Sequence, residues 1–178
     1  MAEIERTRVR ERDAPSLSNY EIALRLAREN AERNRTGRIV CRLDECQQEL
    51  TRQGRLRTYL GHTVKDTPLQ DWIVFTHEVR GASGKHRHQG GLVIYVIDGA
   101  GYSIVDGERV DWEKGDLVLL PMREGGVEHQ HFNENPDKPA VWIAFIRRAI
   151  QEYVASELTQ TEASAEFKAA EEGGRKPA

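Results

Sequence analysis

Residues 115–133 read GDLVLLPMREGGVEHQHFN, and this stretch decides the fold class. Residues 117–120 give a short apolar strand pattern that ends at Pro121. The stretch then closes on two histidines, His129 and His131, one residue apart. Because alternate residues of a strand point to the same face, we expect both imidazoles on one side of a sheet.

A second histidine pair of the same spacing occurs earlier in the chain, at His86 and His88. Two such strands side by side can present up to four imidazoles on one face. Three neutral imidazoles leave two or three positions open on iron, manganese or nickel, where a bidentate substrate and dioxygen can bind together. The pairs therefore predict a compact metal site that oxygen can reach.

His62 and His77 lie outside both pairs and are expected to be surface or strand residues.

The segment from residue 38 to residue 147 alternates short apolar strands with Gly, Asp, Asn and Pro, which is typical of an all-β sandwich or barrel. The predicted strands are 39–41, 56–60, 72–75, 92–97, 102–105, 117–120 and 141–146. Asp106 and Gly107 give the strongest hairpin signal. The tight primed turn needs positive φ angles, which Asp and Gly tolerate.

The N-terminal segment, residues 1–37, is expected to form a polar arm followed by a helix. Ser18 and Glu21 fit a capping box, and small apolar residues recur at helical spacing until Gly37. The Ala-rich stripe of this helix is expected to pack against the domain or a second subunit.

The C-terminal segment, residues 148–178, is expected to form one amphipathic helix and then a disordered, mobile tail from Glu171 to Ala178. The helix should cap the barrel or a dimer interface. Its apolar positions are Ile150, Tyr153, Val154 and Leu158.

The composition favours a small molecule as the partner of a single domain. Charged residues make up 31% of the 178 residues and the net charge is only -3, which gives no case for nucleic acid or an anionic membrane. No apolar run approaches the length of a membrane span, about 20 residues, and the charged N-terminus lacks a signal peptide's apolar core. We therefore predict a cytoplasmic location.

Cys41 and Cys46 are too few for a disulfide framework and lack companion ligands for a structural zinc site.

The two histidine segments resemble the two motifs of the cupin superfamily. The first motif is Gly, five residues, His-x-His, three or four residues, Glu, six residues, Gly; it is matched by His86, His88 and Gly99. The second is Gly, five residues, Pro-x-Gly, two residues, His, three residues, Asn; with three extra residues after the proline, it is matched by Gly115, Pro121, Gly126, His129 and Asn133. The resemblance implies a double-stranded β-helix, or jelly-roll, with a metal site inside the barrel and the two terminal helices outside it.

The resemblance also implies the type of site. Leu92 stands at the Glu position of the first motif, which implies a three-histidine site with His86, His88 and His129 as ligands. Such sites are similar to those of gentisate dioxygenase, related aromatic-ring dioxygenases and thiol dioxygenases. The implied protein is a homodimeric Fe(II) dioxygenase for a small phenolic or aromatic compound, with Mn, Ni or Zn as other metals. The alternatives are a non-catalytic ligand-binding or accessory cupin subunit and a metal-dependent isomerase or lyase.

Four further residues are candidates for substrate contact. His131 can be a fourth ligand, an acid/base near the substrate or a hydrogen-bonding partner that orients a ligand. Ile94 stands where gentisate dioxygenases often carry an arginine, and an inward Ile94 does not bind a carboxylate. Arg123, on the loop after Pro121, can clamp an anionic substrate or remain solvated. Trp142 can line the cavity or belong to the core.

Overall fold

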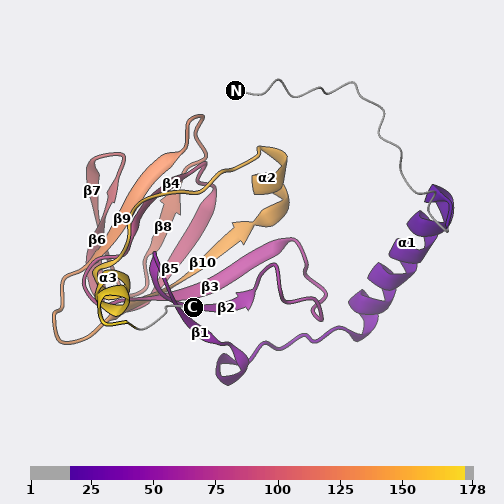
Figure 1. Cartoon of the computed structure of the whole chain (residues 1–178), viewed down its shortest axis with the longest axis horizontal. Coiled ribbons are helices and arrows are strands. Elements are labelled where there is room, and N and C mark those ends of the chain that lie inside the picture. Colours follow the sequence, from indigo (N-terminus) through magenta and orange to yellow (C-terminus); the bar gives the residue numbers. More distant parts are fainter. Residues whose placement is uncertain (1–16, 175–178) are drawn as a thin grey trace.

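Two antiparallel β-sheets lie face to face and form a jelly-roll barrel (Figure 1). A computed structural model of the chain describes residues 17–174. One sheet has the strand order β1-β2-β3-β10-β5-β8 and the other the order β11-β4-β9-β6-β7. The strands are β1 (Gln48–Thr51), β2 (Gly54–Leu60), β3 (Trp72–Val79), β4 (Lys85–His88), β5 (Leu92–Asp98), β6 (Ala100–Val105), β7 (Glu108–Glu113), β8 (Leu117–Leu120), β9 (Val127–Asn133), β10 (Ala140–Arg147) and β11 (Thr159–Glu162). The predicted all-β jelly-roll is confirmed.

The core lies between the two sheets because alternate side chains of each strand point inward. In β5, Leu92, Ile94 and Val96 are buried, whereas the residues between them are exposed. Neighbouring strand β10 repeats this pattern, and Trp142 and Ala144 are among its buried residues. Removing these apolar side chains from water stabilises the closed barrel.

The hairpin between β6 and β7 has the predicted turn. Asp106 and Gly107 have φ angles of 49° and 89°, and Val105 pairs with Glu108 on either side of them. Both central residues thus adopt the positive φ that a primed two-residue turn requires.

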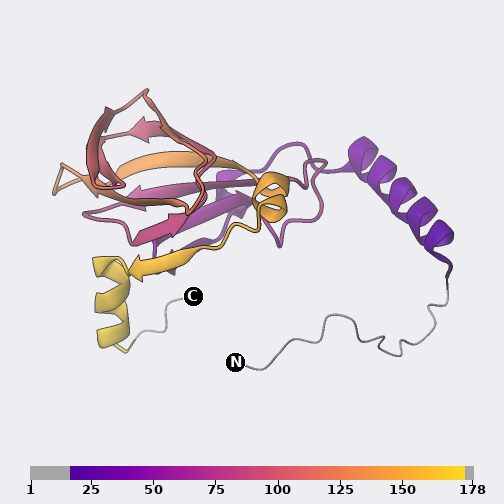
Figure 2. The same cartoon turned by 90° about the horizontal axis from the view of Figure 1, so that it is seen from above.

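The predicted capping box of the first helix is also confirmed. In α1 (Asn19–Thr36), the side chain of Ser18 accepts a hydrogen bond from the backbone of Glu21, and the Glu21 carboxylate accepts one from the backbone of Ser18. Gly37 is the C-cap. No residue of α1 is buried, and the helix projects away from the barrel (Figures 1 and 2). The expected packing of its Ala-rich stripe against its own domain is therefore wrong.

The segment from 39 to 41, predicted as a strand, is an extended connection between α1 and a single 3-10 turn, Leu43–Glu45. Ile39 is 86% exposed and Val40 is 54% exposed. The apolar triplet has no neighbouring strand to pair with, and a strand requires such a ladder partner.

The C-terminal segment is not one long helix. The helix α2 has only six residues (Arg148–Tyr153), and Ala155, just after it, has a positive φ of 49°. Strand β11 follows and pairs with β4. Residues predicted as the start of the tail, Glu171 and Glu172, belong to a third helix, α3 (Ala165–Glu172), whose Phe167 is buried; residues 175–178 of that predicted tail lie outside the described residues.

Within residues 17–174, none of the helices combines the length and the apolar composition that crossing a bilayer requires.

Candidate metal centre

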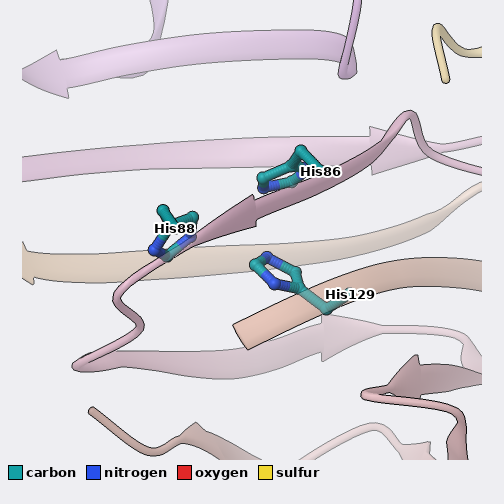
Figure 3. Close-up of side chains that lie close together, drawn as sticks. All are labelled: His86, His88 and His129. Atoms are coloured by element: carbon teal, nitrogen blue, oxygen red, sulfur yellow. The ribbon is translucent and has the colours of Figure 1, made fainter. Parts of the chain in front are cut away.

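Three histidines converge inside the barrel, from two adjacent strands. His86 and His88 lie on β4, and His129 lies directly opposite His86 on β9. All three are at least 93% buried, since their exposed fractions are 7%, 6% and 2%. Figure 3 shows the three imidazoles turned toward one another. Strand alternation produces this convergence, because residues two apart share a face.

The imidazole nitrogens are close enough to share one metal ion. One nitrogen from each ring lies within 4.8 Å of the other two. The ring centroids of His86 and His129 are 4.2 Å apart, and those of His88 and His129 are 4.9 Å apart. Two ligands at 2.0–2.2 Å from a metal, roughly the range for imidazole nitrogen, are separated by a distance of this order or less. The three nitrogens could hold one ion with little movement.

The protonation of the three rings suits metal binding. Burial lowers the pKa of His88 to about 4 and that of His129 to about 3, with a further contribution from the neighbouring imidazoles. Burial lowers the pKa of His86 as well. A neutral imidazole offers the lone pair that a metal needs.

Backbone groups orient two of these rings. Nδ1 of His86 lies 3.2 Å from the carbonyl oxygen of Gly84, and Nδ1 of His129 lies 3.2 Å from that of Val127. A carbonyl can only accept, so we assign the ring proton of both histidines to Nδ1, which leaves the Nε2 lone pair free. Outer hydrogen bonds of this kind orient ligating imidazoles in metal sites.

His88 has the opposite arrangement. The N–H of Gly90 donates to its Nδ1 at 3.0 Å, so the proton of the neutral ring lies on Nε2. Binding of a metal through Nε2 would require His88 to change tautomer.

His131 lies beside this group but outside it. Its ring centroid is 5.4 Å from that of His129, and it is not one of the three rings with nitrogens within 4.8 Å. The pKa of His131 lies well below the ordinary value, first because of burial and then because of neighbouring imidazoles.

A buried serine fixes the His131 ring. Oγ of Ser103 lies 2.7 Å from Nδ1 of His131 and accepts a hydrogen bond from Nε1 of Trp112 at 2.9 Å. Ser103 is fully buried, so its single hydroxyl proton is best satisfied by donating to Nδ1. We therefore assign the ring proton of His131 to Nε2.

The histidines form part of the wall of a cavity of about 330 Å³. This volume is near the lower end of the range for small-molecule sites. Most of the remaining wall is apolar and comes from β2, β3, β5 and β10. The apolar lining residues are Leu56, Ile73, Phe75, Leu92, Ile94, Trp142, Ala144, Ile146 and Leu158.

The other sequence candidates divide between cavity and surface. Ile94 and Trp142 line the cavity together with the histidines, and so does Leu92 at the motif's Glu position. Nε1 of Trp142 is buried with no hydrogen-bond partner. Arg123 does not line this cavity; its side chain is 55% exposed, and its Nη1 binds Asp106 Oδ2 at 2.8 Å. The structure therefore separates Arg123 from the histidines.

His77 is a cavity residue that the motifs did not reveal. It is 2% exposed, burial lowers its pKa to about 3, and its ring packs edge-on against Trp142 at 4.7 Å. Ile73, Phe75 and His77 alternate along β3 and all line the cavity. The alternation of β3 was a signal in the sequence that could have placed His77 inside.

The lining of the cavity also includes polar residues from other segments. Gln151 and Ser156 come from the segment around α2, and Gln53 comes from the turn between β1 and β2. None of the three stands in a recognisable motif, so sequence reasoning had no signal for them.

Comparisons with known proteins agree with this fold. The family model described as "Cupin domain" matches residues 73–146. Gentisate 1,2-dioxygenase of Ralstonia sp. is 37% identical over 59 residues, which are 33% of this chain and 16% of that enzyme. Acireductone dioxygenase of Phaeosphaeria nodorum is 32% identical over 92 residues, which are 47% of this chain and 50% of that enzyme. The chain thus spans half or less of these curated relatives.

A solved structure, Streptomyces PAC13 with uridine, superposes with a TM-score of 0.52 at 13% identity. The match covers 74% of this chain and 96% of that protein. At this identity, the likeness concerns the fold alone.

Proposed function

Residues 73–146 match the family model of the cupin domain, and from that premise we propose that the chain is a metal-dependent dioxygenase for a small phenolic or aromatic compound. The observation that carries the proposal is the set of three imidazole nitrogens within 4.8 Å of one another on the wall of an apolar cavity. The partial similarity to two dioxygenases supports the reaction class.

In this proposal, His86, His88 and His129 hold Fe(II). When bound, Fe(II) would let triplet dioxygen react with a singlet organic substrate and would polarise a substrate oxygen. Three protein ligands leave coordination positions open for small molecules. The donor set suits the ion, because all three rings are neutral and two of them have a free Nε2.

His131 takes a different role in the proposal. Its Nε2–H would donate a hydrogen bond to a substrate oxygen, and Ser103 would keep that tautomer in place. The apolar part of the wall, which includes Ile94 and Trp142, would exclude water and bind the hydrocarbon part of the substrate.

The test begins with metal content, measured by mass spectrometry on untagged protein purified without oxygen. We expect about one iron per chain, lost in His86→Ala and retained in His131→Ala. Oxygen uptake with catechols and hydroquinones should then follow the iron content and fall in His131→Ala. Loss of iron in both variants would instead make His131 a ligand.

Two other results would lead to different functions. Less than about a tenth of an equivalent of any transition metal, unchanged after reconstitution, would reject the oxygenase. A thermal shift with a ligand, but no oxygen uptake, would favour a binding protein, and conversion of the ligand without oxygen uptake would favour an isomerase or lyase.

We also propose that two copies of the chain pair through the outer face of the six-stranded sheet. This face carries large apolar side chains on β5, β8 and β10 that are 36% to 65% exposed: Val93, Tyr95, Ile97, Leu117, Leu119 and Phe145. The register places Val93 beside both Leu119 and Phe145, so the exposed residues are contiguous. A continuous apolar patch of this kind typically marks an interface. The cytoplasmic location stays a prediction from the sequence.

A further inference from the structure

The lining of the cavity contains no residue that carries a permanent charge. Among residues 17–174, the side chains that line it are apolar, histidine, or neutral and polar; Arg, Lys, Asp and Glu are absent from the wall. The neutral polar members are Gln53, Thr58, Gln151 and Ser156.

The absence is notable because cations are abundant on the same strands. In β2, Leu56 and Thr58 line the cavity, whereas Arg55 and Arg57 occupy the alternate positions. Nε of Arg55 binds Glu166 at 3.0 Å, and Nη1 of Arg57 donates to the carbonyl oxygen of Cys46 at 2.9 Å. Strand alternation directs both guanidinium groups away from the cavity.

The strand that carries two of the histidines shows the same separation. Lys85 and Arg87 alternate with His86 and His88 on β4. Nζ of Lys85 pairs with Glu128 at 2.9 Å, and Arg87 donates to the carbonyl groups of Gly125 and Gly126. These cations therefore already have partners on the outside of the barrel.

A cavity of this kind favours one class of substrate. An ionised carboxylate placed in an apolar wall without a cation loses its hydration and gains no compensating pair. Apart from the metal itself, only the histidines and neutral polar groups of the wall would be available to a negatively charged atom.

We propose that the substrate carries no ionised group away from its metal-binding atoms and is a neutral, single-ring chelator such as a catechol with uncharged substituents. This inference rests on the proposed function and specifies its substrate class. The cavity volume of about 330 Å³ agrees with one ring and small substituents.

The test compares two ligands of nearly equal shape: protocatechuate, a catechol whose ring carboxylate lies away from the two hydroxyls, and its amide. Binding to the Fe(II)-loaded chain is measured by titration calorimetry without oxygen, so the readout does not depend on turnover. We expect the amide to bind about 100-fold more tightly, which corresponds to about 2.7 kcal/mol. Equal affinities, or a preference for the carboxylate, would overturn the proposal.

A charge placed on the cavity wall gives a second test. Gln151→Arg should strengthen the binding of protocatechuate about tenfold relative to that of the amide, because it supplies the missing cation. Gln48→Arg, the same substitution at an exposed position of β1 that does not line the cavity, is the matched control. An equal gain in both variants would show that general electrostatics, and not the cavity wall, sets the preference.

Failure of the proposed function looks different from failure of this inference. If the amide binds more tightly than protocatechuate but no oxygen is consumed with either ligand, the dioxygenase proposal fails while the charge preference stands. If both ligands bind with equal affinity and both are oxidised, the charge preference fails while the dioxygenase proposal stands. If neither ligand binds the iron-loaded chain, both proposals are rejected.

Discussion

The α-carbon of Gly90 lies so close to the carbonyl group of Pro121 that a β-carbon on Gly90 would overlap the Pro121 oxygen. Gly90 has a φ of 79° and also donates its N–H to His88. This one residue therefore joins the turn after β4 to the loop after β8 and at the same time orients a histidine of the candidate site.

Gly90→Ala is expected to destabilise the fold by about 3 kcal/mol or more, because it adds a steric overlap to an unfavourable positive φ. Gly125→Ala is the matched control. Gly125 has a φ of 77° but no atom within 4 Å of an added β-carbon, so this variant should lose only about 1–2 kcal/mol. Urea unfolding measures both values, and equal losses would mean that the contact with Pro121 has no effect.

Ser103→Ala is expected to lower kcat about tenfold in the proposed reaction while iron content stays unchanged, because His131 loses the hydrogen bond that fixes its tautomer. Ser83→Ala is the control: Ser83 is equally buried, but its Oγ accepts from the backbone N–H of His131 and not from the ring. Both variants leave a buried group unpaired and should be destabilised similarly. Iron analysis and steady-state kinetics distinguish loss of the His131 tautomer from general destabilisation. Equal kcat values in the two variants would argue against the role given to Ser103.

The stability of the metal-free protein should decrease as the pH falls below about 6.5. Folding lowers the pKa of His88 from 6.5 to about 4 and that of His129 from 6.5 to about 3. Between these values, the unfolded chain binds protons that the folded chain does not, so acid favours unfolding, and stability is complete only above about pH 6.5.

Each such histidine adds at most about 1.4 kcal/mol per pH unit to that slope. His88→Gln should remove one such contribution between about pH 6 and pH 4.5, whereas Gln53→Ala, which alters a cavity residue that does not titrate, should leave the slope unchanged. Denaturant unfolding across this range is the measurement. A slope that His88→Gln leaves unchanged would contradict the buried, neutral state of this ring.

Leu119→Lys is expected to convert a dimer into a monomer without loss of the fold, since Leu119 is 65% exposed on the apolar sheet face. Light scattering should give twice 20.3 kDa for the unaltered chain and 20.3 kDa for the variant. Leu43→Lys alters a residue that is 57% exposed on the 3-10 turn, and it should remain dimeric. A monomeric mass for the unaltered chain would reject the proposed pairing.

Much of the barrel could be predicted because its signals are local. The alternation in β5, β8 and β10, the Asp106-Gly107 turn and the capping box at Ser18 each depend on neighbouring residues. The histidine pairs give one long-range prediction, that the strands β4 and β9 lie side by side. The register, with His86 opposite His129, agrees with this prediction.

Prediction from the sequence failed where the structure of a segment depends on distant partners. Strand β11 has no apolar residue and gives no strand pattern, yet it forms because β4 offers it a free edge. Ile39 and Val40 show the opposite case: both are β-branched, which favours a strand, but no strand lies beside them. His77 was missed because no motif includes it, although the pattern of β3 would have directed it inward.

The pairing of β11 with β4 also affects how the protein is made. Gln160 of β11 donates to the carbonyl oxygen of Lys85, 75 positions earlier in the chain. Until residues 159–162 have been synthesised, β4 lacks this neighbour and has one open edge, and open edges favour pairing with other chains. The strand that presents His86 and His88 gains both neighbours only after residues 159–162 have left the ribosome, so loading of a metal during translation would act on an incomplete barrel.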